Sequence, residues 1–120
     1  MEKKIFILDD DEDLLELTSL ILRKEKHRVI AFSETDNIIE EVKKVNPDLI
    51  LMDLWMPGLN GDDAYKLLQK DDKTRSIPVI LVSAHPQLKQ IADSLQIEYL
   101  NKPFDVKALR QKVYEVSKSA

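Results

Sequence analysis

The chain has 120 residues, 43% of them apolar and 33% charged, so it has room for one globular domain with one core. Its 22 acidic and 18 basic residues give a net charge of -4, which argues against direct nucleic-acid binding, and the lack of cysteine excludes disulfides, thiolate zinc sites and cysteine nucleophiles. The first apolar run, residues 5–8, is too short for a secretory signal or a membrane span, so we expect no membrane contact and a cytoplasmic location.

Short apolar runs alternate along the chain with stretches whose apolar residues recur at helical spacing. The runs are continuous, which is typical of strands covered on both faces, and they lie at residues 5–8, 29–32, 49–52, 79–82 and 98–100. We expect the stripe after each run to be the core-facing side of a helix. In chain order the stripes are Leu14, Leu17 and Ile21; Ile38, Val42 and Val45; Ala64, Leu67 and Leu68; Leu88, Ile91, Ala92 and Leu95; and Val106, Leu109, Val113 and Val116. This order predicts an α/β fold, an open doubly wound parallel sheet in a single domain over residues 1–120.

Polar residues stand where the predicted strands end. Asp9 and Asp10 follow the first run, Asp53 the third, Ser83 the fourth and Lys102 the fifth. Ligands of open α/β sheets bind beyond the carboxyl ends of the strands, so these side chains should share one edge. Clustered carboxylates repel one another unless a hard cation such as Mg²⁺ offsets the charge, and Mg²⁺ is typically held by one or two carboxylates plus phosphate oxygen. The set predicts a Mg²⁺ site prepared for a phosphoryl group.

The remaining acids of the first cluster have a simpler interpretation. Asp11, Glu12 and Asp13 stand at the start of the first predicted helix, where acidic side chains cap the helix and interact favourably with its dipole. We therefore assign them to the helix N-terminus and not to the metal site.

The loop after Asp53 leaves that carboxylate available for chemistry. Pro57-Gly58 and Asn60-Gly61 supply the turn residues, so Asp53 is not needed as one. Carboxylates can act as nucleophiles toward phosphorus and form an acyl phosphate. Lys102 offers a positive charge for phosphoryl oxygens and Ser83 a hydrogen-bond donor.

Four segments together resemble the receiver domain of bacterial response regulators: Asp9-Asp10, Leu51–Gly58, Leu81–Ala84 and Tyr99–Phe104. The resemblance extends from about Lys3 to Ser117. It implies a flavodoxin-like sheet of five parallel strands in the order 2-1-3-4-5, with five helices, which puts the first and third strands side by side.

The resemblance also implies a role for each acidic residue. Asp53 would be the phosphoacceptor, and Mg²⁺ would be the cofactor. Asp10, Asp53 and the backbone carbonyl of Trp55 would bind the ion directly, while Asp9 would act through a bound water.

Three further residues take roles from the same resemblance. Ser83 and Lys102 would hold the phosphoryl oxygens, and Tyr99 would swing inward when Ser83 moves toward the phosphoryl group. The Lys102-Pro103 peptide bond would be cis.

Some positions depart from the usual receiver pattern. Ser83 stands where threonine is commoner, but both residues donate a hydroxyl. Trp55 and His85 occupy the two positions that tune hydrolysis of the phospho-aspartate in the family, and Trp55 is unusually large for a site open to water. Residues 95–97, Leu-Gln-Ile, replace a common Gly-Ala pair before the fifth strand. The sequence therefore does not define where the fourth helix ends.

The implied function is that of a phosphorelay receiver, without turnover on a separate substrate and so not an enzyme. The implied donor is a sensor histidine kinase or a histidine phosphotransfer protein. The downstream protein target would bind the face formed by the fourth helix, the fifth strand and the fifth helix. The chain would be a free-standing receiver or a piece of a longer regulator.

Three alternatives compete with the receiver function. A degenerate receiver would bind partners without phosphorylation, although every expected reactive residue is present. A phosphatase of the haloacid-dehalogenase type fits less well, because residues 9–13 fail the last position of its opening motif and its acidic pair should follow the lysine. A calcium-binding EF-hand is excluded, since Leu14 and Leu20 stand where Gly and Glu are required.

Overall fold

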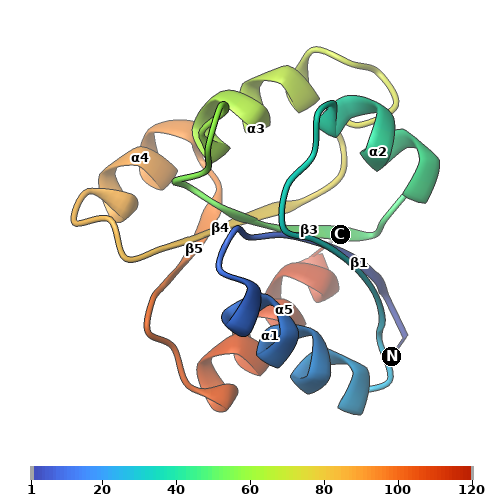
Figure 1. The fold of residues 1–120 in the computed structure, drawn as a ribbon, viewed down its shortest axis with the longest axis vertical. Helices are drawn as coiled ribbons and strands as arrows, with labels where there is room; N and C mark the ends of the chain where they lie inside the picture. The colour runs from blue at the N-terminus through green and yellow to red at the C-terminus, as the bar shows by residue number, and fades with distance from the viewer. Residues whose placement is uncertain (1, 120) are drawn as a thin grey trace.

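The computed structural model describes residues 2–119 as one five-stranded parallel sheet with helices on both faces (Figure 1). The strand order is β2-β1-β3-β4-β5, so the predicted α/β fold with flavodoxin-like topology is confirmed. The elements in chain order are β1 Lys4–Leu8, α1 Glu12–Lys24, β2 Arg28–Phe32, α2 Ile38–Val45, β3 Leu49–Asp53, α3 Gly61–Gln69, β4 Val79–Ser83, α4 Leu88–Leu95, β5 Glu98–Asn101 and α5 Val106–Ser119.

The sheet separates two apolar layers. In Figure 1, α2, α3 and α4 cover one face, and α1 and α5 cover the other. Alternate residues of each central strand enter opposite layers, as in β1, where Phe6 packs under α2–α4 and Ile5 and Ile7 under α1 and α5. Strands β3 and β4 are buried along their whole length, which explains their continuous apolar sequence.

The predicted core-facing side of α1 is confirmed only at Ile21, which packs against the core. Its stripe included Leu17, but this side chain is 51% exposed, and so is that of Leu20. The residues that face the sheet include Thr18, Ser19 and Leu22. A buried serine is tolerated there because the Ser19 hydroxyl donates a hydrogen bond to the Leu15 carbonyl at 2.7 Å. Tertiary packing chose a side of this helix that hydrophobicity alone does not reveal.

The other stripes are largely confirmed. Ile38 and Val42 of α2 and Leu88 and Ala92 of α4 are buried. Leu67 of α3 and Val106 of α5 are exceptions, at 41% and 47% exposed.

The fourth helix ends without a glycine. Gln96 adopts the left-handed conformation, with φ of 59°, and the Ile97 amide donates to the Ala92 carbonyl at 3.0 Å to close the last turn. Helix α4 therefore passes directly into β5. Across residues 2–119, no helix is long and apolar enough to cross a membrane.

Candidate functional site

Three carboxylates meet at the carboxyl edge of the sheet. Asp9 follows β1 and Asp53 ends β3, and these strands are direct neighbours, with Leu8 paired to Met52. Asp9 and Asp53 are buried, whereas Asp10 is exposed. One oxygen from each carboxylate lies within 4.8 Å of the others, so the three can reach a common cation. Asp11, by contrast, caps α1 as expected: its side chain accepts the Leu14 amide at 3.1 Å.

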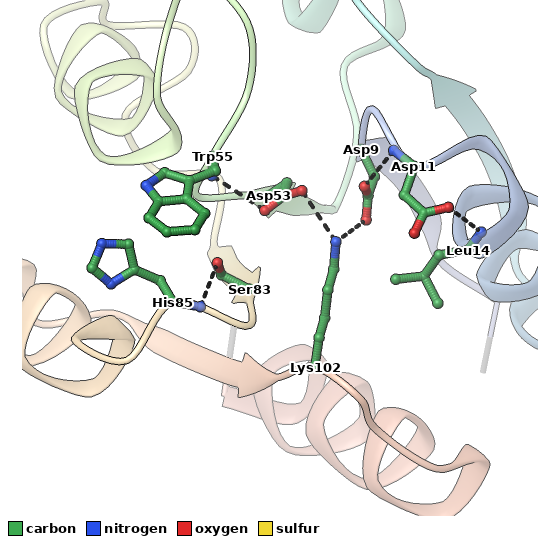
Figure 2. A network of polar contacts seen from close by, with 8 residues as sticks. All are labelled: Asp9, Asp11, Leu14, Asp53, Trp55, Ser83, His85 and Lys102. Atoms are coloured by element: carbon green, nitrogen blue, oxygen red, sulfur yellow. Dashed lines mark hydrogen bonds and ion pairs between the residues drawn. The ribbon is translucent and has the colours of Figure 1, made fainter.

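Lys102 directly follows β5, and its side chain reaches the same acidic cluster. Its ammonium nitrogen lies 2.9 Å from Oδ2 of Asp9 and 3.1 Å from Oδ2 of Asp53 (Figure 2). The Lys102 amide donates to the Ser83 carbonyl at 2.8 Å, which holds the start of this segment against the end of β4. The peptide bond between Lys102 and Pro103 is cis.

The charges in this cluster are strongly coupled. Burial raises the pKa of Asp53 from 3.8 to about 6, although the hydrogen bond and charge of Lys102 lower it and the charge of Asp9 raises it. Burial lowers the pKa of Lys102, but its hydrogen bonds to Asp9 and Asp53 outweigh that effect and leave the pKa above its usual value. The three carboxylates of the cluster, Asp9, Asp10 and Asp53, therefore carry more negative charge than Lys102 can neutralise.

The loop after Asp53 brings the start of helix α3 against the Asp53 backbone. A Cβ on Gly61 would lie 2.4 Å from the Asp53 carbonyl oxygen, so only glycine allows α3 to begin so close to β3. Gly58 supplies a positive φ of 86° in the same loop. The Trp55 amide donates to Oδ1 of Asp53 at 3.2 Å, which orients the carboxylate. The Asn60-Gly61 pair predicts only a turn, and nothing in the sequence indicates this close approach.

Ser83 ends β4 and is 2% exposed. Its oxygen accepts the His85 amide at 3.0 Å, a bond that uses an oxygen lone pair and leaves the hydroxyl proton for another acceptor. Tyr99 lies half-buried in β5, on the strand next to Ser83, and the ammonium of Lys112 lies 5.9 Å from its ring centre. Ser83 and Tyr99 thus lie on neighbouring strands, β4 and β5.

The rings of Trp55 and His85 lie face to edge beside Asp53. Their ring centres are 4.4 Å apart with an interplanar angle of 65°, and Figure 2 shows both rings at the side of Asp53 opposite Asp9. The His85 ring is held by the Gln87 amide, which donates to its Nδ1 at 2.9 Å. The two positions singled out from the sequence therefore form one aromatic contact.

The donor set suits Mg²⁺. Mg²⁺ prefers oxygen ligands and retains several waters, and the cluster offers carboxylate oxygens with one exposed side, at Asp10. The residues predicted from strand ends are thus brought together, with Asp9, Asp53 and Lys102 in direct contact. The sequence-based prediction missed the direct ion pair between Asp9 and Lys102, because it depends on how far apart β1 and β5 lie in space.

Comparison with known proteins identifies the family. The family model described as the response regulator receiver domain matches residues 5–114. The chain belongs to the response regulator receiver family. Receiver domains are signalling modules of two-component systems, and the acidic cluster is compatible with the Mg²⁺ site of such a receiver.

The curated relatives of this receiver are regulators about twice its length. The chain is 29% identical over 116 residues to the DNA-binding response regulator MtrA of Mycobacterium tuberculosis, covering 94% of the chain and 50% of that protein. It is 26% identical over 119 residues to the phosphate regulon transcriptional regulatory protein PhoB of Escherichia coli, covering 97% and 52%. The chain thus spans about half the length of these relatives.

Solved structures show the same receiver fold. A putative response regulator from Chloroflexus aurantiacus superposes with a TM-score of 0.90 at 22% identity, over 98% of this chain and 99% of that one. A response regulator from Desulfuromonas acetoxidans has a TM-score of 0.84 at 27% identity, over 97% of each chain.

Proposed function

We propose that this receiver accepts a phosphoryl group on Asp53 from a phosphohistidine of a sensor histidine kinase or histidine phosphotransfer protein. The observation that supports this most directly is the buried Asp53 carboxylate, oriented by the Trp55 amide and paired with Lys102 at 3.1 Å. A carboxylate oxygen attacks phosphorus, the phosphorus–nitrogen bond breaks, and the imidazole nitrogen leaves with the electron pair. The product is an acyl phosphate.

The grouping of Asp9, Asp10 and Asp53 supports a metal site in the same place. By the receiver resemblance, Asp10, Asp53 and the backbone carbonyl of Trp55 would bind Mg²⁺ directly, and Asp9 would bind it through water. When bound, Mg²⁺ neutralises charge on the phosphoryl oxygens. Lys102 would also bind the phosphoryl group. Its ammonium can move from Asp53 to a phosphoryl oxygen and still keep its ion pair with Asp9.

Ser83 and Tyr99 would carry the signal away from the site. The free hydroxyl proton of Ser83 can be donated to a phosphoryl oxygen. The accompanying shift of Ser83 would make room for Tyr99, which lies on the neighbouring strand. The resulting population shift would alter the α4–β5–α5 face, where we place the downstream protein target.

Labelling with acetyl phosphate and Mg²⁺ tests this function. We expect one phosphoryl group per chain, located on Asp53 by peptide mapping, and loss of labelling when EDTA removes the metal. Amide chemical shifts of Ser83, Tyr99 and α4 should change in the labelled protein.

Labelling at another residue, or labelling that survives EDTA, would contradict the phosphorylation of Asp53. Chemical-shift changes confined to the acidic cluster would contradict the proposed conformational switch. Absence of labelling would favour a degenerate receiver, and steady turnover of a phosphomonoester would favour a phosphatase.

The Trp55–His85 contact should prolong the phosphorylated state. The indole stands beside the acceptor and restricts the approach of water to the acyl phosphate. We expect Trp55→Ala to speed hydrolysis of phospho-Asp53 about fivefold, measured by loss of label after the donor is removed. Tyr114→Ala is a suitable control, because Tyr114 is also an exposed aromatic residue but lies on α5. A lifetime that is unchanged or longer in Trp55→Ala would refute the shielding role.

A further inference from the structure

A hollow of about 370 Å³ lies beside the acceptor, between the β2–α2 loop and the β3–α3 loop. Its apolar lining includes Leu8, Ile38, Met56 and Ala64. Leu8 directly precedes Asp9, and Met56 is the third residue after Asp53. The hollow therefore opens at the same edge of the sheet as the acidic cluster, although the proposed phosphoryl chemistry does not use it. Its volume falls within the range of small-ligand pockets.

The rim of this hollow is acidic and lacks a cation. Glu34 and Asp36 line it, and both are exposed. Neither forms an ion pair or side-chain hydrogen bond with any of the residues that the structure describes. Its described lining contains no lysine, arginine or histidine. An apolar floor below two unpaired carboxylates suits a ligand with an apolar stem and a cationic end.

We propose that the hollow binds a long basic side chain, arginine or lysine, of the phosphodonor protein. The stem would lie on Met56 and Ile38, and the charged end would pair with Glu34 and Asp36. This assignment rests on the proposed phosphotransfer function and adds a contact that selects the donor. A protein held for transfer to Asp53 must lie over this edge, so a neighbouring side chain can reach the hollow. The opposite charges also accelerate the encounter of the two proteins.

A small probe tests the chemistry of the hollow. We expect n-butylguanidinium, added with saturating Mg²⁺, to shift the amide signals of residues 33–38 and 56–64. Neither n-butanol nor guanidinium alone should reproduce these shifts, because each lacks one half of the ligand. The affinity should fall about fivefold in the double variant Glu34→Gln/Asp36→Asn and stay unchanged in Glu2→Gln/Asp72→Asn, which removes the same charge elsewhere. Absence of these shifts, or equal affinity in both double variants, would refute the site.

Phosphotransfer kinetics test the identity of the occupant. The donor is a phosphorylated histidine phosphotransfer domain, chosen because it labels Asp53. We expect n-butylguanidinium and Glu34→Gln/Asp36→Asn each to slow this transfer about fivefold and to leave labelling by acetyl phosphate unchanged. If the probe binds but transfer is unaffected, the hollow takes a free organic cation and the donor assignment is wrong. Failure of acetyl phosphate to label the wild type would instead refute the function proposed for Asp53.

Discussion

Asp53→Asn is expected to abolish phosphorylation and, without Mg²⁺, to stabilise the fold. An amide cannot form the acyl phosphate, so labelling by acetyl phosphate should fall to background. The same change removes a negative charge that burial makes unfavourable, as the raised pKa of about 6 shows. We expect the free energy of unfolding at pH 7.5 to rise by about 1–2 kcal/mol.

The direction in which wild-type stability changes with pH follows from the raised pKa of Asp53. Between the ordinary pKa of 3.8 and the folded-state pKa of about 6, the folded protein keeps a proton on Asp53 that the unfolded chain has released. The wild type should therefore lose stability as the pH rises through this window, and Asp53→Asn should not. Urea unfolding at several pH values measures the difference. Asp62→Asn in α3 is a control that should keep both the labelling and the wild-type pH profile.

Mg²⁺ should reduce the difference in the free energy of unfolding between the wild type and Asp53→Asn. A bound cation removes the same charge penalty in the wild type. A variant that is still labelled would overturn the acceptor assignment. A variant less stable than the wild type at pH 7.5 would overturn the electrostatic account.

Lys102→Met is expected to have the opposite effect on stability. Methionine keeps an unbranched apolar stem but removes the ammonium that contacts Asp9 and Asp53. Both carboxylates are buried, so they would face each other without a cation. We expect the free energy of unfolding at pH 7.5 without Mg²⁺ to fall by about 2–4 kcal/mol.

The loss should be reversible by two independent routes. Lowering the pH to about 5 protonates Asp53, whose pKa is already raised and rises further without Lys102, and so restores stability. Adding Mg²⁺ restores stability by neutralising the carboxylates.

Labelling of Lys102→Met should nevertheless remain about 100-fold slower than labelling of the wild type, because the phosphoryl group loses a positive contact. Lys89→Met removes an exposed partner of Asp93 and should leave the free energy of unfolding nearly unchanged, because solvent screens this pair. Equal losses in the two lysine variants would refute the role of Lys102.

The fold could be predicted because its strands carry a strong signal. Strands β1, β3 and β4 are buried on both faces, and burial on both faces requires a continuous apolar run. Helix α1 shows the limit of such patterns. Leu17 and Leu20 look like core residues in the sequence but are exposed. Ser19 looks like a surface residue but is buried, because its hydroxyl donates a hydrogen bond to the Leu15 carbonyl.

The site was predictable for a related reason. The carboxyl ends of parallel strands share one edge, so a polar residue directly after each apolar run identifies the chemistry without coordinates. That reasoning placed Asp9, Asp10, Asp53, Ser83 and Lys102 at one edge. It carried no information on which of them touch.

The order of strands and helices, the residue types at the strand ends and the receiver resemblance can all be read from the amino-acid sequence. Three features depend on the folded structure: the pairing of Lys102 with both Asp9 and Asp53, the contact between Trp55 and His85, and the hollow below Glu34 and Asp36. The reason is that hydrophobic periodicity depends on neighbours along the chain. Ion pairs, ring contacts and hollows depend on distances between segments far apart in sequence, which are set by the twist of the sheet and the packing of its loops.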